Sequence, residues 1–554
     1  MLIVSLSSVS RQAFIQSQTR CLHATRLAKH SKAFVTTPIY YVNAVPHIGH
    51  LYSTVLADTI RRNYALHGKE VIMSTGTDEH GLKIQQAAKK NNMQPIEFCD
   101  KVSESFRKLC TAANIEYTSF QRTTSPTHKK AVKELWNTLL KNGYLYKGKH
   151  EGWYAVSDEA FYAPNQVKEV TDEKTGEKTM VAIESGQKVE WMSEENYKFR
   201  LSLFGDKLVE WIDSHPTAIV PHNRRNEVLS WIKAGLADLS VSRLRSRLDW
   251  GIEVPNDPEH TIYVWLDALT NYLTATGYPW HGEHSSPNKE AFPPDVQIVG
   301  KDIVRFHAIY WPAFLMAADL PLPKQILAHA HWTMGKQKMS KSRGNVVDPF
   351  EVLDTYGVDP VRYYLVRDGG LADDGDYSEK MIKTRYKKDL AGQLGNLLNR
   401  TTAKSLLPSG VVPGNSLNTA TVHPNDQMLH DQIRAVPENF NKAFEEREFN
   451  KAYAFIFDML SQANKHFTEN EPWKMTQNIE DKERLDTILF YSLEACRVAG
   501  ILLQPIMPTK MESLLNQLGV PKDERYFKDS LSLKVGKDIT VNKTEADILF
   551  PRLK

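Results

Sequence analysis

Cysteine is scarce in this sequence. The 554 residues include four cysteines, and these are widely spaced: Cys21, Cys99, Cys110 and Cys496. Small secreted domains that depend on disulfides place many cysteines at short intervals. We therefore expect no disulfide framework in this chain.

Long hydrophobic runs are also missing. No segment approaches the roughly 18 consecutive apolar residues of a membrane-spanning helix, so the sequence predicts no membrane span. A G-x-G-x-x-G turn is absent, which leaves a dinucleotide-binding interpretation with little support. The composition, with 41% hydrophobic and 24% charged residues, is typical of a globular protein, and the length allows two to four domains. A net charge of +3 is compatible with an RNA partner but does not argue for one.

Acidic residues are absent from the start of the chain. The first is Asp58, whereas residues 1–32 contain many serines and five basic residues: Arg11, Arg20, Arg26, Lys29 and Lys32. This composition predicts a mitochondrial transit peptide over residues 1–32, cleaved within residues 20–32. The alternative is a basic extension without a targeting role. A secretory signal is disfavoured because no charged residue precedes the short apolar start.

The most informative stretch covers residues 33–50, AFVTTPIYYVNAVPHIGH. Phe34 and Val35 predict a short buried strand, and a helix is predicted after the segment His47–His50, which reads HIGH. Histidines three residues apart share one face of a helical turn, and a helix N-terminus favours phosphate because its N–H groups lack partners. Gly49 lets a nucleotide approach the backbone closely. Alone, so short a motif is weak, because chance occurrence and buried core histidines explain most such matches.

A second motif follows much later, KMSKS at residues 338–342, with RGN directly after it. Lysines, hydroxyls and a glycine in a polar loop suit a mobile clamp on phosphate groups. An ordinary solvated loop is the usual interpretation of such a charged segment. The presence of both motifs in this order favours phosphate binding.

Five segments together resemble the methionyl-tRNA synthetases, a family of class I aminoacyl-tRNA synthetases. They are TTPIYYVNAVPHIGH, TGTDEHG, YVWLDAL, GKDIVRFH and KMSKSRGN. The resemblance covers nearly the whole chain from about Lys32. It implies an α/β fold, with a Rossmann-like parallel-sheet catalytic domain split by an insertion and followed by an all-α anticodon-binding bundle. The alternation of strand and helix patterns from Phe34 to Tyr144 also predicts a parallel sheet, whose ligands bind beyond the carboxyl ends of its strands.

The expected domains follow from these patterns. After the leader, we predict a first catalytic half at 33–144, an insertion at 145–238, a second catalytic half at 239–323, a KMSKS region at 324–385 and a helical domain at 386–554. The parallel sheet is expected to resume near Thr261. Amphipathic helical runs are predicted at Leu390–Leu406, Asn425–Asn470, Leu485–Leu503 and Met511–Leu518.

The insertion departs from the zinc-bearing members of the family. Those relatives bind a structural zinc through cysteines, whereas this sequence has no cysteine between Cys110 and Cys496. Ala155 and Asp158 occupy the corresponding stretch. Because a structural zinc needs closely spaced Cys or His ligands, we predict that this protein holds no zinc and has no other metal site of its own.

Activation of an amino acid joins its carboxylate to the α-phosphate of ATP and expels pyrophosphate. The enzyme mainly positions the reactants and stabilises charge on the phosphates. The ATP-binding residues that the resemblance implies are His47, Gly49, His50, Asp302, Lys338, Ser340 and Lys341. The two histidines and two lysines of this set are the expected catalytic residues. Asp302 either accepts a hydrogen bond from ribose or caps the helix that follows it, and Mg²⁺ is expected to accompany ATP.

A thioether side chain favours an apolar pocket with aromatic walls. The methionine-binding residues that the resemblance implies are Pro38, Ile39, Tyr41, Asp78, Trp265, Ala268, Leu269, Tyr272, Ile303 and His307. Asp78 would pair with the ammonium group of the substrate. Leu269 stands where the family often has proline. Taken singly, most of these residues are also typical of an ordinary core.

The second step of the implied reaction transfers methionine to the terminal adenosine of tRNA, by initial attack of the 2′-hydroxyl. Unpaired anticodon bases are read by aromatic stacking and by hydrogen bonds to base edges. Asn396 and Arg400, four residues apart on a predicted helix, and Trp473 match the anticodon-reading residues of the family. Trp473 is also compatible with a packing role at a helix end. The chain ends directly after the bundle, without the dimerisation domain of some relatives, so we expect a monomer.

The resemblance thus implies a methionine–tRNA ligase of the mitochondrial matrix that uses ATP, methionine and tRNA(Met). One alternative is a class I synthetase for Leu, Ile, Val or Cys; the short insertion and the lack of zinc ligands argue against these. A second is an inactive RNA-binding paralogue, which the intact HIGH and KMSKS motifs disfavour. A third is a small-molecule nucleotidyltransferase, which would leave the helical C-terminal part unexplained.

Overall fold

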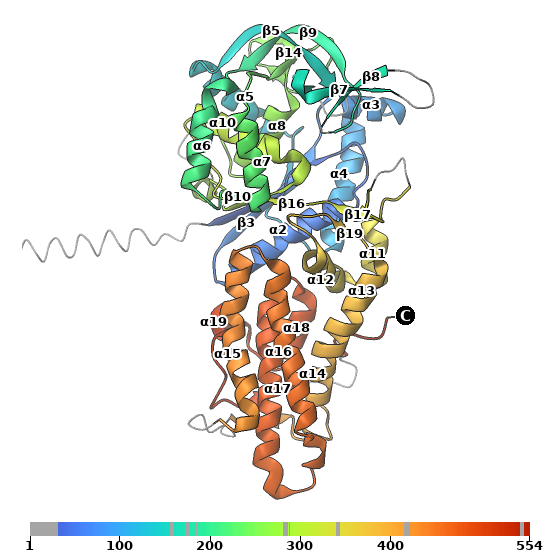
Figure 1. Ribbon diagram of the computed structural model, residues 1–554, viewed down its shortest axis with the longest axis vertical. Coiled ribbons are helices and arrows are strands. Elements are labelled where there is room, and N and C mark those ends of the chain that lie inside the picture. Colours follow the sequence, from blue (N-terminus) through green and yellow to red (C-terminus); the bar gives the residue numbers. More distant parts are fainter. Residues whose placement is uncertain are drawn as a thin grey trace, which may run out of the picture.

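The computed structural model describes residues 32–155, 160–162, 164–171, 178–183, 185–280, 286, 288–339, 344–414, 422–542 and 548–553. The predicted transit peptide, apart from Lys32, lies outside these residues. The molecule is elongated, with an α/β part at one end and a bundle of helices at the other (Figure 1). This arrangement agrees with the predicted catalytic domain followed by an all-α domain.

One sheet forms the centre of the α/β part. Its strands lie in the order β10 (Ile219–Val220), β16 (Ile326–His329), β15 (Val296–Gly300), β1 (Ala33–Thr36), β3 (Val71–Asp78) and β2 (Tyr40–Tyr41), and β4 (Ser119–Arg122) also pairs with β3. All of these pairs are parallel. The prediction of a parallel nucleotide-binding sheet is therefore confirmed.

Both faces of this sheet are covered. Successive strand residues point to opposite faces, and Phe34 and Val35 accordingly belong to two different hydrophobic clusters. The cluster that contains Val35 continues through α2 (Ile48–Leu66) into the helical bundle, where it includes Leu489. The α/β part and the bundle thus share one apolar core.

Helices connect the strands of the sheet and cover it. They are α2, α3 (Leu82–Lys90), α4 (Pro95–Ala112), α5 (Pro126–Lys141), α6 (Gly205–Ser214), α7 (His222–Lys233), α8 (Val264–Leu269), α9 (Asn271–Thr274) and α10 (Trp311–Ala317). Among the described residues, no helix is long and apolar enough to cross a membrane. Cys99, Cys110 and Cys496 are buried free thiols.

The insertion is a separate antiparallel structure. Long strands β5 (Leu145–Ala155) and β9 (Glu190–Phe199) pair along their length, flanked by β6 (Ala160–Tyr162) and β11 (Leu239–Ser240), and β7 (Val167–Thr171) pairs with β8 (Lys178–Ala182). Ala155 is buried in a small cluster with Val167, Ala182 and Val189. Apolar packing therefore occupies the stretch where zinc-bearing relatives place cysteines. Asp158 lies outside the described residues, and no group of metal-ligating side chains occurs within them.

The strand near Thr261 corrects one expectation. It is β14 (Asp257–Ile262), which pairs antiparallel with β12 (Ser242–Leu244) and β13 (Glu253–Val254) in a sheet of their own. The parallel sheet has already resumed at β10, before this hairpin, and its next strand after the hairpin is β15. An antiparallel hairpin and a parallel strand can begin with the same β-branched pattern, so the local sequence did not distinguish them.

The KMSKS region and the helical part follow β16. The small sheet β18 (Gln337–Lys338), β17 (Trp332–Met334) and β19 (Gly375–Asp376) lies beside α11 (Pro349–Tyr356) and α12 (Val358–Asp368). The bundle contains α13 (Glu379–Arg385), the π-helix η7 (Tyr386–Gly395), α14 (Asn396–Thr401), α15 (Pro424–Glu445), α16 (Phe449–Glu469), α17 (Lys482–Leu503), α18 (Pro508–Gln517) and α19 (Phe527–Ser530), with β20 (Val411–Val412) pairing β21 (Ile539–Thr540).

The predicted helical run Asn425–Asn470 is helical, but it is divided in two. It forms two helices, α15 and α16, which pack against each other. The chain reverses between them at Arg447, whose φ of 64° lies in the left-handed region. Such a backbone conformation ends a helix even where the apolar periodicity continues on both sides.

Candidate active site

The HIGH segment caps a helix at the carboxyl end of the parallel sheet. His47 is the N-cap of α2, and its Nδ1 accepts a hydrogen bond from the N–H of Gly49 at 3.0 Å. Nδ1 of His50 accepts in turn from the backbone N–H of His47 at 3.1 Å, and the two ring centroids are 3.8 Å apart. A neutral imidazole that accepts through Nδ1 carries its proton on Nε2. Both rings thus present an N–H at the start of the helix.

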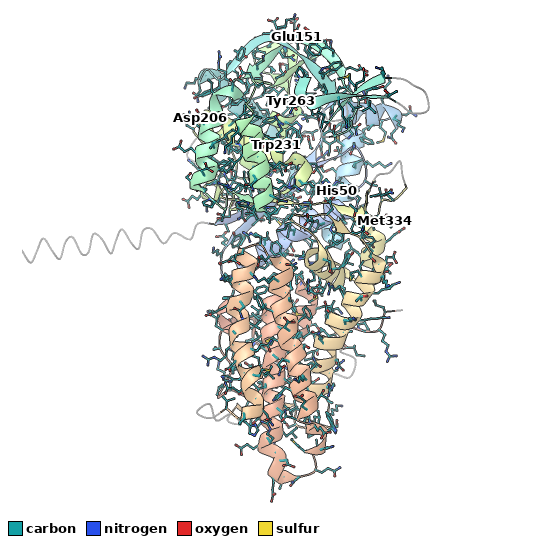
Figure 2. The ribbon with its side chains drawn as sticks, viewed as in Figure 1. His50, Glu151, Asp206, Trp231, Tyr263 and Met334 are labelled. Atoms are coloured by element: carbon teal, nitrogen blue, oxygen red, sulfur yellow. The ribbon has the colours of Figure 1, made fainter. Side chains whose placement is uncertain are left out.

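His50 lies near the middle of the long axis of the molecule, whereas Glu151 of the insertion lies at one end (Figure 2). The helix start therefore faces the region between the insertion and the bundle. Its backbone N–H groups and the two Nε2–H donors form an arrangement that favours an anion.

Asp302 and its neighbours lie after β15. Oδ1 of Asp302 is 3.1 Å from Nε2 of His331, and Nζ of Lys301 contacts Oδ1 of Asp374 at 2.7 Å. The hydrogen bond places Asp302 beside another loop of the sheet edge.

The KMSKS loop is described only in part. Lys338 ends β18, and Met339 packs against the core that α2 shares with the bundle. Ser340 and Lys341 lie outside the described residues. Their predicted contacts with ATP stay a prediction.

Four of the residues expected at the methionine site make one contact group. His307 receives a hydrogen bond from the hydroxyl of Tyr272 to its Nε2 at 2.7 Å, and its Nδ1 lies 3.0 Å from the carbonyl of Ile303. The ring of Trp265 lies 6.4 Å from that of His307, edge to face. Trp265 also stacks on Phe306 with centroids 3.6 Å apart, so Phe306 joins this contact group, although the sequence did not single it out.

His307 is held in one protonation state. A carbonyl can only accept, so Nδ1 of His307 donates to Ile303 and Nε2 accepts from Tyr272. Burial lowers the pKa of His307 to about 4, although the hydrogen bond to Ile303 opposes this shift. The imidazole is therefore neutral at physiological pH.

The other expected methionine residues lie on neighbouring segments. Ala268 and Leu269 are buried on α8, and Pro38 and Ile39 directly precede β2. Tyr41 pairs with Asp78 across the parallel strands β2 and β3 and packs against the same hydrophobic cluster as Trp265. Asp78 is buried at the carboxyl end of its strand. The fold thus brings a carboxylate and an aromatic group to one edge of the sheet.

Three further residues link these segments. His80, Asp267 and His128 are buried and joined by hydrogen bonds of 2.6 Å and 2.8 Å to the two carboxylate oxygens. Two of them belong to the quoted segments TGTDEHG and YVWLDAL. The pattern alone did not single them out, because the three residues lie far apart in the chain.

The expected anticodon residues gather on one surface of the bundle. Nδ2 of Asn396 lies 3.5 Å from Oδ1 of Asn464, and the guanidinium of Arg400 contacts Thr468 at 3.3 Å. That guanidinium also lies over the rings of Phe467 and Trp473, at 4.5 Å and 5.8 Å from their centroids. The loop between α16 and α17, which contains Trp473, lies at the end of the bundle farthest from the parallel sheet (Figure 1). Trp473 is 44% exposed, so its ring is available for stacking.

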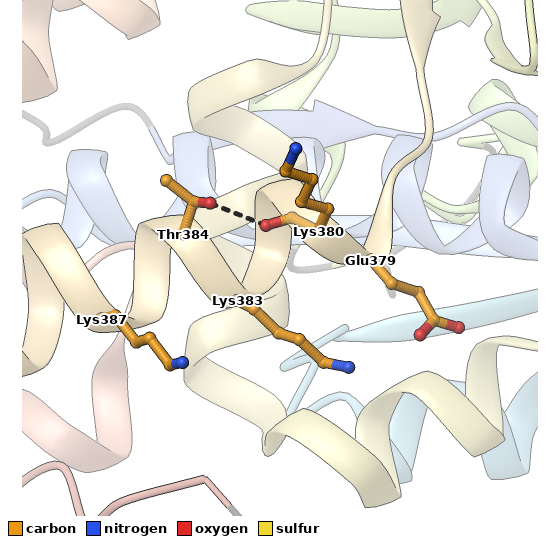
Figure 3. Close-up of a pocket in the computed structure, with 5 residues that line it drawn as sticks. All are labelled: Glu379, Lys380, Lys383, Thr384 and Lys387. Carbon is orange, nitrogen blue, oxygen red and sulfur yellow. Dashed lines mark hydrogen bonds between the residues drawn. The ribbon is translucent and has the colours of Figure 1, made fainter.

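A basic pocket lies between the two ends of the molecule. It is lined by Glu379, Lys380, Lys383, Thr384 and Lys387 of α13 and η7 (Figure 3). The three lysines are exposed and recur at intervals of three and four residues, which places them on one side of the helix.

Two protein-family models match the chain. The model described as tRNA synthetases class I (M) matches residues 33–402, and the one described as the anticodon binding domain of methionyl tRNA ligase matches residues 417–552. Among curated proteins, the probable mitochondrial methionine–tRNA ligase of Dictyostelium discoideum is 43% identical over 92% of both chains. The mitochondrial methionine–tRNA ligase of Xenopus laevis is 44% identical over 94% of this chain and 92% of that protein.

The fold has a similar counterpart among solved structures. Methionyl-tRNA synthetase of Mycobacterium tuberculosis, bound by methionyl-adenylate, superposes with a TM-score of 0.87 and 38% identity over 94% of this chain and 100% of that one. The parallel sheet, the helix capped by HIGH and the helical bundle define a class I aminoacyl-tRNA synthetase. Within that class, the chain belongs to the methionyl-tRNA synthetase family.

Proposed function

We propose that this protein activates methionine with ATP to methionyl-adenylate, releases pyrophosphate, and transfers methionine to the 3′-terminal adenosine of tRNA(Met). The observation that carries this proposal is the neutral, aromatic contact group of Trp265, Tyr272 and His307. His307 follows β15 in the chain and the capped helix α2 follows β1, and these two strands are parallel neighbours, so both segments begin from the carboxyl ends of adjacent strands. An apolar pocket beside an anion-binding helix start suits a thioether amino acid and a nucleoside triphosphate.

In the activation step, Nε2–H of His47 and His50 would donate to the phosphates of ATP. Lys338 and Lys341 would add positive charge to the β- and γ-phosphates, with Gly49 and Ser340 allowing close approach of the nucleotide. Asp302 would accept a hydrogen bond from a ribose hydroxyl. These groups stabilise charge that develops as pyrophosphate leaves, and none of them removes a proton. Mg²⁺ is supplied as its complex with ATP, whose phosphates provide oxygen ligands.

The methionine side chain would lie against the wall formed by Trp265, Tyr272 and His307. Asp78 would pair with the ammonium group, because a carboxylate buried at a strand end binds a cation more strongly than one in water. Ala268, Leu269 and Ile303 would complete the wall, with Pro38, Ile39 and Tyr41 closing the side next to β2.

The anticodon would be read at the far end of the bundle. Trp473 would stack on an unpaired base, and Asn396 and Arg400 would contact base edges. A role in the mitochondrial matrix is supported by the acid-free leader and by the mitochondrial relatives. We further propose that the protein is a monomer without structural zinc, with the domain boundaries given above.

The test is ATP–pyrophosphate exchange with each of the twenty amino acids, using the full chain. Strong exchange with methionine alone supports the proposal. Lys341→Ala should lower the rate by about 100-fold or more, because it removes a charge that acts on the phosphates. Exchange with another amino acid would overturn the methionine pocket, and no exchange from folded protein would overturn the activity.

His47→Asn gives a matched variant. Asparagine can still accept the N–H of Gly49 and cap α2, but it lacks the Nε2–H donor. We expect exchange to fall by about 10-fold to 100-fold while the melting temperature is unchanged. Unchanged exchange would exclude His47 from phosphate binding.

A further inference from the structure

A single buried carboxylate joins three segments around the methionine site. Oδ2 of Asp267 accepts from Nδ1 of His80 at 2.6 Å, and Oδ1 accepts from Nε2 of His128 at 2.8 Å. Asp267 and His128 are fully buried, and His80 is 2% exposed. The three residues come from α8, from the segment after β3 and from the first turn of α5.

The chemistry of this group fixes its geometry. Burial alone would raise the pKa of Asp267, but the two imidazoles hold it below the usual range, so the side chain is a carboxylate. A carboxylate only accepts hydrogen bonds, so His80 donates through Nδ1 and His128 through Nε2. Nδ1 of His128 is hydrogen-bonded to the hydroxyl of Thr274 at 2.9 Å, which fixes the ring further.

Asp267 and its partner His80 adjoin expected substrate contacts in the chain. On α8, Asp267 lies two residues after Trp265 and directly before Ala268. In the segment after β3, His80 lies two residues after Asp78. Glu79, between them, is itself held by hydrogen bonds from Thr77 and Arg122 at 2.7 Å and 2.6 Å. A shift of Asp267 would therefore move the apolar wall and the carboxylate of Asp78 relative to each other.

Stability alone does not explain this arrangement. Replacing a buried charged group by apolar residues of similar volume is often neutral or stabilising, so a core could do without it. Hydrogen bonds fix the distance between two segments to a fraction of an ångström, which apolar packing does less well.

We propose that Asp267, with His80 and His128, is the positioning centre of the methionine pocket. It sets the separation between Asp78 and the wall at Trp265, and so selects an amino acid by the distance from its ammonium group to its side chain. This inference rests on the proposed methionine-activating function and adds three positioning residues to it.

The test compares variants that remove a hydrogen bond with variants that keep it. Asp267→Asn, His80→Leu and His128→Leu should raise KM for methionine by about tenfold or more in pyrophosphate exchange, with KM for ATP changed less than about twofold. His80→Asn keeps a donor at the Nδ1 position and His128→Gln keeps one at Nε2, so both should retain a KM near that of the wild type. If Asp267→Asn does not fold, the proposal is tested by comparing the two variants at each histidine: His80→Leu with His80→Asn, and His128→Leu with His128→Gln.

The bundle offers a matched control. Asp426 of α15 accepts a hydrogen bond from Nε2 of the buried His466 at 2.7 Å, so it is a similar Asp–His contact remote from the parallel sheet. Asp426→Asn should lower the melting temperature and leave KM for methionine unchanged. Equal changes in KM for methionine and ATP in the Asp267 variants, or none, would overturn the inference. Wild-type protein that fails to exchange with methionine would instead overturn the proposed function.

Discussion

The burial of His307 as a neutral imidazole makes a pH-dependent contribution to stability. Its pKa of about 4 lies below the value of about 6.5 for an unfolded histidine. Between these values the unfolded chain binds a proton that the folded chain does not, so the free energy of unfolding rises with pH across this window. The contribution is fully present above pH 6.5 and is lost as the pH falls toward 4.

His307→Asn should remove that contribution. Wild-type protein should lose about 1.4 kcal/mol of unfolding free energy per pH unit from His307 below pH 6.5, and the variant should lack this slope. Urea unfolding at pH 8, 7, 6 and 5 measures the difference. His329, whose pKa is also lowered to about 4 by burial, stays in both proteins and leaves a common slope. If the free energy of unfolding changes with pH in the same way in both proteins, His307 does not have the lowered pKa that keeps it neutral.

Single residues show what a sequence reveals and what it hides. His47 and His50 were recognisable because the motif is contiguous and local, and the capped helix start follows from the same few residues. Asp267, His80 and His128 were not recognisable as a unit, because their contact depends on how α5, α8 and the end of β3 meet. The stack of Phe306 on Trp265 was hidden for the same reason.

The same distinction holds for the elements. Parallel strands and crossover helices were predictable from alternating periodicity. The strand β14 has the same local pattern as a strand of the main sheet, and because pairing partners are not encoded locally, the sequence did not show that it pairs elsewhere. The division of the run Asn425–Asn470 into two helices depends on one residue, Arg447, in a left-handed conformation. Apolar periodicity continues across such a reversal and therefore conceals it.

Three helices are joined by one buried guanidinium. Nη2 of Arg362 on α12 contacts Asp58 of α2 at 2.6 Å, and Nε donates to the carbonyl of Ile506, just before α18, at 3.0 Å. Both side chains of this ion pair are fully buried. Burial would raise the pKa of Asp58, but Arg362, and then Arg62 and Arg61, keep it below its usual range.

Arg362→Leu should therefore destabilise the protein by about 3–5 kcal/mol, because it leaves a buried carboxylate without its main partner. Thermal and urea unfolding measure the loss. Arg245→Leu is the control, since that arginine forms exposed ion pairs with Asp249 and Glu253, and it should leave the unfolding midpoint unchanged. Adding Asp58→Leu to the Arg362 variant should recover part of the loss. A stability equal to wild type in the single variant would show that this ion pair does not hold the helices together.

At the scale of the whole molecule, a tRNA that reaches from the far end of the bundle to the sheet would pass the intervening surface. The lysines of the pocket on α13 and η7 (Figure 3) lie in this interval, as the position of α13 in Figure 1 shows. Lysines on one side of a helix attract the phosphate backbone without regard to sequence, and each neutralised phosphate releases counterions. This surface is expected to contribute affinity, whereas specificity is expected from the proposed anticodon-reading residues Asn396, Arg400 and Trp473.

The double variant Lys383→Gln and Lys387→Gln should weaken tRNA binding and leave pyrophosphate exchange unchanged, because activation needs no tRNA. The slope of log affinity against log salt should fall by about one for each phosphate that the protein no longer neutralises. Aminoacylation at several salt concentrations measures the weaker tRNA binding and the change in salt slope. Lys522→Gln is the control. This exposed lysine pairs with Glu512, and its substitution should change neither tRNA binding nor the salt slope. An unchanged salt slope in the double variant would mean that the tRNA follows another path between the anticodon surface and the site of transfer.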